Sequence, residues 1–359
     1  MPDILLFGAT GYTGRLTAHA LAERRASFAI AGRDKAALET LAEAIGRPEV
    51  RRAVVGDPAG LARALGDVSV LLTCVGPFVD LGETAVEAAL RAGVHYIDCC
   101  GEGEFIAKLI AERGEQARSA GVTLAPAMAF DEVPADVAAT LASDGLASPR
   151  LVLTYSVPAV ASRGTARSAL ESMTATGPWI VNGQPIPVAA GDRERWAPLP
   201  PPLGPKPSIS VPLAELHLAP LHLQLGSLEV YMTARPLQRV GLTLGLPALR
   251  AALAARPVRR ALDEVISTVV REPSIERRKA RGWAVLAEAR AGPGWRNVAI
   301  TGNDVYGLSA NLLASGAMHI AEAGCDRSGV VAPTEAVPID ALQKELIRQG
   351  ASIETFEPA

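Results

Sequence analysis

Short apolar runs alternate with longer amphipathic stretches along the first 130 residues of the chain. Apolar runs of this length predict buried strands, and the stretches between them predict helices that end near a glycine. The predicted strands cover residues 4–7, 28–33, 51–57, 68–75, 94–99 and 122–126, and the clearest helices cover 61–65, 83–92 and 104–120. Strands separated by helices predict a Rossmann-type, doubly wound parallel sheet, and therefore an α/β fold.

The second half of the chain has a different pattern. Leu151–Val157 and Gly226–Thr233 alternate apolar and polar residues, as half-buried strands of a mixed or antiparallel sheet do. The chain then offers a long helix at Ala310–Ala323, a shorter one at Ile339–Gln349 and a final strand at Ala351–Phe356. With 359 residues, two domains are expected, the second an α+β domain with a mixed or antiparallel sheet.

The first strand leads directly into a glycine-rich turn that opens a helix. The turn reads Gly8-Ala9-Thr10-Gly11-Tyr12-Thr13-Gly14. In such a turn the first glycine permits the tight bend, the second lets the backbone approach a pyrophosphate, and the third lets the helix pack against the strand. The helix N-terminus then offers N–H groups to the phosphates. The spacing is GxxGxxG, one residue longer than GxGxxG, and the context predicts a dinucleotide site.

The end of the second strand favours NADP over NAD. Arg33 lies 19 residues after Gly14, where NAD-binding folds place an acidic residue for the ribose 2′-hydroxyl. A guanidinium is suited to a 2′-phosphate, and Lys35 adds a second cation, whereas Asp34 between them favours NAD. A solvated surface arginine is the alternative. The pattern predicts NADP as the cofactor.

Ligands of parallel sheets lie beyond the carboxyl ends of the strands, which selects further loops for the cofactor. Asp57 is predicted to meet the adenine amino group. Gly76 and Pro77 are predicted to lie under the nicotinamide ribose, with Phe78 covering the ring, although Gly-Pro is also an ordinary turn.

Composition narrows the class of protein. Hydrophobic residues make up 49% and charged residues 20%, which is typical of a globular protein, and the net charge of −3 gives no general attraction to nucleic acid. The four cysteines lack metal-ligand spacing, so we expect reduced thiols and no metal. We find no signal peptide and no apolar run of about 18 residues, and expect a cytoplasmic protein.

Together these motifs resemble the saccharopine dehydrogenase-like superfamily, most closely its trans-acting enoyl reductase branch. The resemblance rests on the glycine turn, Ala31-Gly32-Arg33, Val75–Phe78, Gly93–Asp98 with Gly101-Glu102, and Phe130–Asp136. It covers nearly the whole chain, strongly to residue 136 and patchily through Arg163–Ser168, Ile275–Ala289, Gly302–Tyr306 and Gly329–Pro333. Ala129, Glu132 and Ser309 depart from the family pattern.

The resemblance implies a domain division and an activity. Residues 1–130 are expected to bind NADP, residues 131–299 to form the substrate and dimerisation domain, and residues 300–359 to pack back on the first domain. It implies NADPH-dependent reduction of a C=C bond in an enoyl, polyketide or lipid-like substrate. An imine or amino-acid dehydrogenase of the saccharopine type needs cations for its carboxylates, and Arg163 and Arg167 are the main candidates. A non-catalytic NADP-binding scaffold is the third reading.

No proton donor is evident from a motif. We take Asp131 as the first candidate because it ends the sixth strand on the cofactor side, followed by Tyr96 and Tyr155, which alternatively belong to the core. Arg163, Thr165 and Tyr306 are further candidates. His95 and His319 are expected to be surface or core histidines, and Asp136 is a candidate cap for the helix after Pro134.

Two segments of the second half have distinctive sequences, one typical of a loop and one of a contact surface. Seven prolines between Pro198 and Pro212 predict a long loop, as a connector in preference to a lid. Leu242–Val270 combines helical apolar spacing with arginines, and Pro257 should divide it into two helices. We expect it to form core or homodimer contacts, with peripheral membrane contact a distant second.

Overall fold

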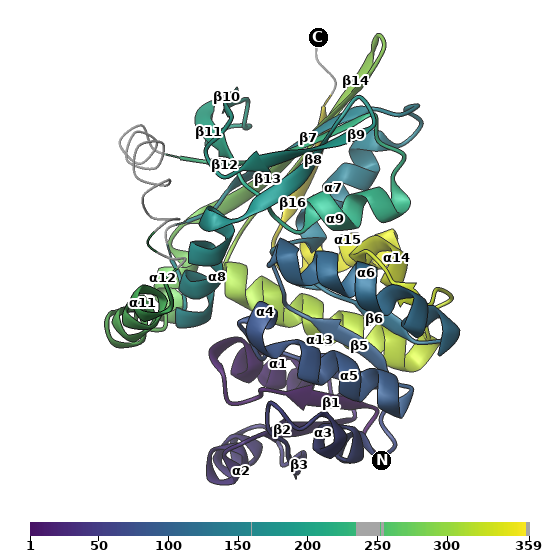
Figure 1. The fold of residues 1–359 in the computed structure, drawn as a ribbon, viewed down its shortest axis with the longest axis vertical. Coiled ribbons are helices and arrows are strands. Elements are labelled where there is room, and N and C mark those ends of the chain that lie inside the picture. Colours follow the sequence, from purple (N-terminus) through teal and green to yellow (C-terminus); the bar gives the residue numbers. More distant parts are fainter. Residues whose placement is uncertain (159, 235–251, 253–254, 357–359) are drawn as a thin grey trace. The chain divides into compact units, whose positions relative to one another are not determined.

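The computed structural model describes residues 1–158, 160–234, 252 and 255–356, and its fold is α/β (Figure 1). The chain divides into two compact units. The first contains residues 1–133 and 305–349, and the second contains residues 134–304 and 350–359. Each unit is built on its own β-sheet.

The first unit contains a seven-stranded sheet, sheet A, in which every pair of neighbours is parallel. Its strands are β1 (Ile4–Phe7), β2 (Phe28–Gly32), β3 (Glu49–Arg52), β4 (Val70–Thr73), β5 (His95–Asp98), β6 (Thr123–Ala125) and β15 (Gly329–Val330). The strand order is β15-β6-β5-β4-β1-β2-β3, so the direction of winding reverses between β1 and β4. The predicted doubly wound parallel sheet is confirmed.

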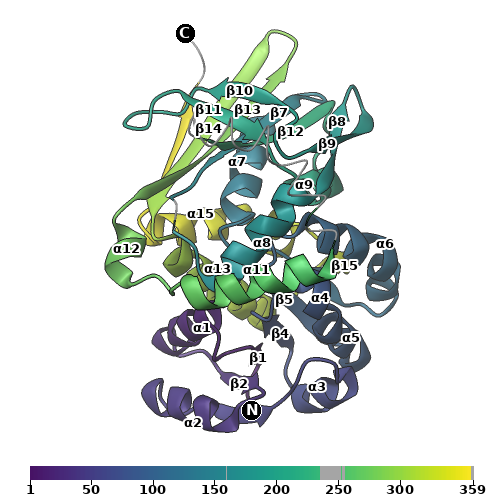
Figure 2. The ribbon, with the colours of Figure 1, turned by 60° about the vertical axis from the view of Figure 1, so that its left-hand side comes forward.

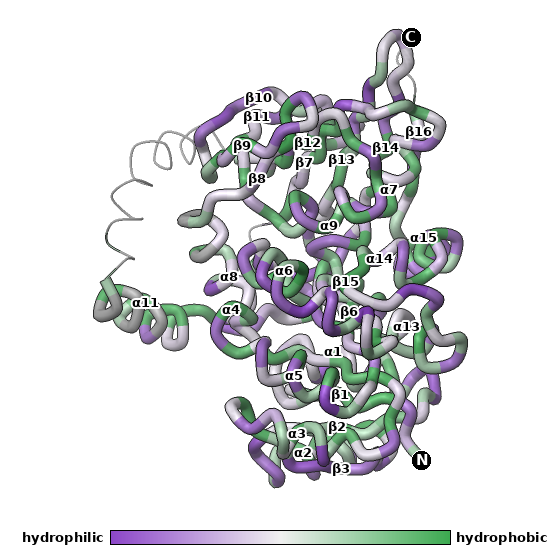
Figure 3. Tube along the Cα trace, turned by 45° about the vertical axis from the view of Figure 1, so that its right-hand side comes forward, coloured by the Kyte–Doolittle hydropathy of each residue, from purple (hydrophilic) through white to green (hydrophobic). Residues whose placement is uncertain are grey.

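Helices cover both faces of sheet A, which is why strands such as β1 and β2 are buried along their whole length. One face carries α1 (Tyr12–Glu23), α2 (Lys35–Ala44) and α13 (Val305–Ala323), and the other carries α3 (Pro58–Leu65), α4 (Phe78–Leu81), α5 (Glu83–Ala92) and α6 (Gly103–Ser119). Two further helices of this unit are α14 (Pro333–Ala336) and α15 (Ile339–Arg348). Figure 3 shows hydrophobic residues along β1 and mixed hydropathy along α2 and α3.

The second unit contains a mixed sheet, sheet B (Figure 2). Its strands are β7 (Arg150–Ser156), β8 (Thr176–Val181), β9 (Gln184–Ala189), β10 (Glu194–Ala197), β11 (Lys206–Ser210), β12 (Ser227–Thr233), β13 (Gly282–Ala291), β14 (Gly294–Asn303) and β16 (Ser352–Phe356). The order is β10-β11-β12-β7-β13-β14-β16, with β8 and β9 attached to β12. Among the described strands only β7 and β12 are parallel, so the predicted mixed sheet is confirmed.

Five described helices accompany sheet B. They are α7 (Val133–Ser143), α8 (Arg163–Thr174), α9 (Glu215–His222), α11 (Arg256–Val269) and α12 (Ile275–Lys279). Helices α8 and α11 lie side by side in both Figure 1 and Figure 2. Arg167 Nη2 donates to Ser267 Oγ at 2.8 Å, and Arg163 Nε donates to the carbonyl of Val270 at 3.0 Å.

The C-terminal segment is shared between the two units. Helices α13, α14 and α15 and strand β15 belong to the first unit. The final strand β16 differs from the expectation that all of residues 300–359 pack on the nucleotide domain. It pairs antiparallel with β14 from Thr301↔Ser352 to Asn297↔Phe356, because β14 would otherwise leave its backbone groups unpaired at the edge of sheet B.

The proline-rich segment contributes to the core of the second unit. Ala197 and Leu199 are buried against Ala284, Leu286 and Ala299 of sheet B. Leu203 and Phe356 pack against the same cluster. The contacts of Leu199 are those of a connector that covers a sheet.

The predicted contact segment Leu242–Val270 lies in part outside the described residues, which omit 242–251 and 253–254. Its described portion contains α11, and Pro257 lies in the first turn of that helix. Three valines of α11 are exposed: Val258, Val265 and Val269. Within the part of the chain that the structure describes, no helix is long and apolar enough to cross a membrane.

Candidate functional site

The glycine turn after β1 brings the start of α1 against the end of the strand. Gly8 has a φ of +83°, and a Cβ atom there would lie 2.6 Å from Val75 Cγ2. A Cβ on Gly14 would lie 2.2 Å from the carbonyl oxygen of Gly8 and 3.0 Å from Ala9 Cα. The approach of helix to turn therefore requires glycine at position 14. Gly11 has ordinary dihedral angles, and a Cβ there meets only the Gly8 carbonyl, at 3.3 Å.

The turn presents the N-terminus of α1 at the carboxyl edge of sheet A. Gly11 is the N-cap residue, and no side chain caps the helix. Its N–H donates to the carbonyl of Gly8 at 3.0 Å, while Arg15 Nη1 donates to the carbonyl of Thr10 at 2.7 Å. The amides that follow Gly11 lie in the first turn of α1, the part of a helix whose N–H groups can serve as donors to an anion. The Tyr12 ring packs edge-to-face on Tyr306 of α13, with centroids 5.1 Å apart.

The three charged residues after β2 have different roles. Asp34 is the N-cap of α2, and its Oδ1 accepts from the amide of Ala37 at 3.1 Å. Lys35 lies 3.5 Å from the carboxylate of Glu39 one turn along the helix. Arg33 is exposed, and its guanidinium makes no hydrogen bond or ion pair within the described residues. Asp34 thus serves as a helix cap, and this role removes the argument for NAD that its charge offered.

The loops after β3 and β4 place the other predicted cofactor residues. Asp57 caps α3, accepting from the amide of Gly60 at 2.7 Å. Gly76 and Pro77 connect β4 to α4 beside the glycine turn, since the neighbouring backbone of Cys74 lies close to Gly8. Phe78 is buried and packs on Phe105 of α6, with centroids 5.7 Å apart. Its ring is therefore held in the core, and covering the nicotinamide would require it to leave that contact.

A buried carboxylate joins the ends of β5 and β6. Asp98 Oδ2 accepts from the hydroxyl of Tyr96 at 2.6 Å, and Oδ1 accepts from the amides of Cys100 at 2.8 Å and Ala127 at 2.7 Å. Burial raises the pKa of Asp98 to about 6, against the lowering effect of these hydrogen bonds. Ala127 has a φ of +59°, so Asp98 holds a strained turn.

Tyr96 does not have the geometry of a proton donor to a substrate. Its side chain is fully buried and its hydroxyl is committed to Asp98. Burial and the neighbouring Asp98 raise the pKa of Tyr96 well above its ordinary value. Tyr155, the third catalytic candidate, is also buried, within β7 between β12 and β13. The burial of both tyrosines favours the alternative that they belong to the core.

Asp131 differs from the two tyrosines because it reaches solvent. It follows β6 and lies against Gly101, where a Cβ atom would come within 3.3 Å of Asp131 Cγ. Protein atoms around the carboxylate limit its solvation although it is exposed, and the nearby Glu102 carboxylate adds repulsion. Both effects raise the pKa of Asp131 to about 6. Glu102 itself accepts from the amide of Val79 at 2.8 Å.

Two contacts, one in each unit, join residues that carry no signal in the sequence. Ser309 of α13 accepts from the amide of Phe130 at 3.2 Å and donates to the carbonyl of Val305, which fixes the turn before Asp131. In the second unit, His222 Nε2 and the buried Asp136 Oδ1 are 2.7 Å apart, whereas the sequence indicates Asp136 only as a helix cap. Each pair joins residues that are 86 or more positions apart, and no local sequence pattern predicts such a contact.

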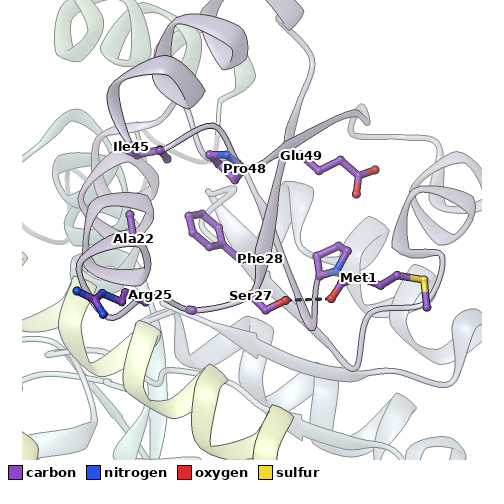
Figure 4. A pocket seen from close by; sticks show the side chains of 11 residues that line it. Met1, Ala22, Arg25, Ser27, Phe28, Ile45, Pro48 and Glu49 are labelled. Carbon is purple, nitrogen blue, oxygen red and sulfur yellow. Dashed lines mark hydrogen bonds between the residues drawn. The ribbon is translucent and has the colours of Figure 1, made fainter.

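The described residues contain no group of three or more His, Cys, Asp or Glu side chains that could hold a metal ion. A depression in the first unit is lined by Met1, Arg25, Phe28, Ile45, Glu49 and their neighbours (Figure 4). These residues lie at the amino ends of the strands and the carboxyl ends of α1 and α2. The depression is therefore at the edge of sheet A opposite to the glycine turn.

The glycine turn and Arg33 lie in a region that matches a known family. Residues 4–125 match the saccharopine dehydrogenase NADP binding domain. The chain carries a saccharopine dehydrogenase NADP-binding domain. The glycine turn, the unpaired Arg33 and the capping role of Asp34 fit this cofactor.

Curated relatives of this NADP-binding domain carry two names. A saccharopine dehydrogenase-like oxidoreductase of Mus musculus is 32% identical over 152 residues, which are 37% of this chain and 35% of that protein. A trans-acting enoyl reductase of Mycobacterium leprae is 37% identical over 142 residues, 38% of this chain and 34% of that protein. The matched region thus spans about a third of the length of each relative.

The fold extends this likeness to the whole chain. Saccharopine dehydrogenase (L-Glu forming) from Saccharomyces cerevisiae, solved in its apo form, superposes with a TM-score of 0.63 over 100% of both chains. The sequence identity is 13%, so this similarity concerns the fold alone.

Proposed function

We propose that this protein is an NADPH-dependent oxidoreductase that reduces a C=C bond of an apolar enoyl, polyketide or lipid-like substrate. The observation that carries the proposal is the carboxyl edge of sheet A, where a glycine turn that admits no side chain at Gly14 lies in the same sheet as the unpaired Arg33. NADPH, when bound, supplies the hydride. The relative named trans-acting enoyl reductase supports the choice of a C=C bond.

The residues of the turn are proposed to hold the cofactor by its phosphates. The backbone from Gly8 to Gly14 surrounds the pyrophosphate, with amides at the start of α1 as donors. Arg33 binds the 2′-phosphate through its fork of N–H groups. Asp57, Gly76 and Pro77 border the same edge, and Phe78 supports the loop from the core.

Asp131 is proposed as the proton donor. It follows β6 at the carboxyl edge, reaches solvent, and has a pKa raised to about 6, so it carries a proton more readily than an ordinary aspartate. Asp98 and Ser309 hold the turn that leads to it. Protonation of the carbanion left by hydride addition needs such a group within hydrogen-bond reach.

The amino-acid dehydrogenase alternative draws support from the saccharopine dehydrogenase-like relative. It requires cations that bind substrate carboxylates. Two half-buried arginines of the second unit are already engaged: Arg195 with Glu288 at 2.7 Å, and Arg296 with the backbone carbonyls of Leu141 and Asp144. The buried Arg278 has Nε 3.3 Å from Asp304, while its Nη1 has no hydrogen-bond partner among the described residues. Arg163 and Arg167 bind α11 and its end. These contacts favour the apolar substrate.

The proposal also includes a homodimer partner and a cellular location for the protein. The second unit is proposed to bind the substrate and to mediate a homodimer, for which the exposed valines of α11 offer an apolar surface. A cytoplasmic enzyme with reduced thiols is expected, since the four cysteines are free.

The test is turnover of NADPH with two substrate panels, one of α,β-unsaturated acyl thioesters and enones and one of imines with keto acids. We expect oxidation of NADPH, followed at its near-ultraviolet absorbance, with the first panel only. Turnover restricted to the second panel contradicts the C=C assignment and supports the amino-acid dehydrogenase. Tight NADPH binding without turnover in either panel supports a non-catalytic scaffold.

A further inference from the structure

Arg52 lies beside the residue that precedes Arg33. Strand β3 is the edge strand of sheet A and pairs in parallel with β2, with Arg52 opposite Gly32. Neighbouring strands are about 4.8 Å apart and consecutive Cα atoms about 3.8 Å, which places the Cα of Arg52 within about 9 Å of the Cα of Arg33. Both arginines therefore stand at the carboxyl ends of adjacent strands.

The direction of the Arg52 side chain follows from that of Arg51. The Arg51 guanidinium donates to the carbonyls of Ala64 and Leu65 in α3, so it lies on the α3 face of the sheet. Successive side chains of a strand point to opposite faces, which turns Arg52 toward the other face. Right-handed crossovers place α2 on that other face, because the chain moves outward from β2 to β3 and back inward from β3 to β4. Arg33 is the first residue after β2 and lies in a bend before α2, so the alternation within the strand does not set its direction.

Arg52 and Arg33 are both available to a ligand. Each is exposed, and neither guanidinium makes a hydrogen bond or ion pair with the residues that the structure describes. Other charged side chains nearby already have partners. Lys35 faces Glu39, Asp34 caps α2, and Arg51 is paired with Glu49 at 2.9 Å.

We propose that Arg52 is the second specificity residue for the 2′-phosphate of NADPH, and that it acts with Arg33 in place of Lys35. A phosphate monoester carries close to two negative charges at neutral pH and several acceptor oxygens, so it can accept from two guanidinium groups at once. Arg33 approaches from the end of β2 and Arg52 from the end of β3. Lys35 is the weaker partner because its ammonium group already lies 3.5 Å from the Glu39 carboxylate. The inference rests on the NADP assignment but not on the identity of the substrate.

The experiment measures NADPH and NADH dissociation constants by fluorescence titration at low and at high salt, on the full chain. The variants are Arg33→Ala, Arg52→Ala and Lys35→Ala, with Arg63→Ala as the matched control. Arg63 is an exposed arginine in the last turn of α3, on the opposite face. Loss of one charge-assisted hydrogen bond predicts that Arg52→Ala weakens NADPH roughly tenfold and leaves NADH unchanged. Lys35→Ala should have a smaller effect, and Arg63→Ala none.

Two further variants separate charge and geometry from folding. Arg52→Lys keeps the charge but not the fork of donors, and should recover only part of the NADPH affinity. Arg52→Gln keeps part of the side-chain stem and serves if Arg52→Ala fails to fold by circular dichroism. In both, the preference for NADPH over NADH should fall while NADH affinity stays constant.

The possible results separate the role of Arg52 from the assignment of NADP as the cofactor. If Arg33→Ala weakens NADPH selectively and Arg52→Ala does not, Arg52 has no role and the NADP assignment stands. If Arg52 variants weaken NADPH and NADH equally, Arg52 stabilises the edge strand and the inference is wrong. If no variant alters the preference, the 2′-phosphate is bound elsewhere. The substrate panels test the catalytic proposal separately.

Discussion

The carboxyl edge of sheet A and the interior of sheet B are built on different principles. At the edge of sheet A, a few residues adjacent in sequence set the geometry, as with Gly8, Gly11 and Gly14. In sheet B, contacts join distant segments, as when the proline-rich segment at Leu199 packs on β13 and β14. A side chain added to the first region should therefore act directly on cofactor binding. The second responds to substitution through stability.

The largest expected effect on cofactor binding follows from Gly14→Val. A Cβ at this position would lie 2.2 Å from the Gly8 carbonyl oxygen, so the helix must move away from the turn. We expect loss of measurable NADPH binding together with destabilisation of about 1–3 kcal/mol or more, as overpacking produces. Isothermal titration and chemical unfolding measure the two quantities. Normal NADPH affinity in this variant would show that the turn is not the cofactor site.

Gly11→Val should separate binding from folding. The φ of Gly11 is −68°, and the nearest atom to a Cβ at this position is the Gly8 carbonyl oxygen at 3.3 Å, so the free protein can accept valine with small shifts. The branched side chain would nevertheless occupy the space where the pyrophosphate approaches the backbone. We expect a circular dichroism spectrum like that of the wild type and no detectable NADPH binding. Unfolding comparable with Gly14→Val would contradict the distinction between the two glycines.

Asp131→Asn tests chemistry at the same edge without touching the cofactor. The pKa of Asp131 is raised to about 6, so the protonated form declines as the pH rises through that value. If Asp131 donates the proton, wild-type kcat/KM falls as the pH rises above about 6. The variant should lose roughly 100-fold in kcat/KM, a typical contribution of general acid catalysis, together with this pH dependence.

The NADPH dissociation constant of Asp131→Asn is the control and should not change. A wild-type pH profile retained by the variant would assign the proton transfer to another group.

The same contrast explains how far the sequence predicts the molecule. The hydrophobic pattern and flanking glycines predict helix α5 and strand β1 with their observed bounds, because these signals are local. The pattern predicts the third strand at 51–57, but β3 ends at Arg52. Gly56 takes a positive φ and Asp57 caps α3, so these residues leave the sheet to start the next helix.

The candidate site is predictable where a function needs adjacent residues. The turn and Arg33 can be found because their spacing is a property of one strand-turn-helix unit. The network of Asp98 with Ala127, and that of Ser309 with Phe130, arises only when β5, β6 and α13 come together. For the same reason the sequence suggests Tyr96 and Tyr155 as donors. Their burial depends on how segments distant in sequence pack on the faces of the sheets, which the local pattern does not specify.

The smallest expected effect on the cofactor comes from the second region. Leu199→Ala removes a buried side chain that packs with Ala284 and Leu286, and large-to-small core substitutions of this kind cost about 2–5 kcal/mol. We expect a lower unfolding midpoint and an unchanged NADPH dissociation constant, because the cofactor residues belong to the other unit. Leu221→Ala is the matched control, since Leu221 is 38% exposed and its truncation leaves no cavity. Weaker NADPH binding by Leu199→Ala at temperatures well below its unfolding transition would show that the two regions are energetically coupled.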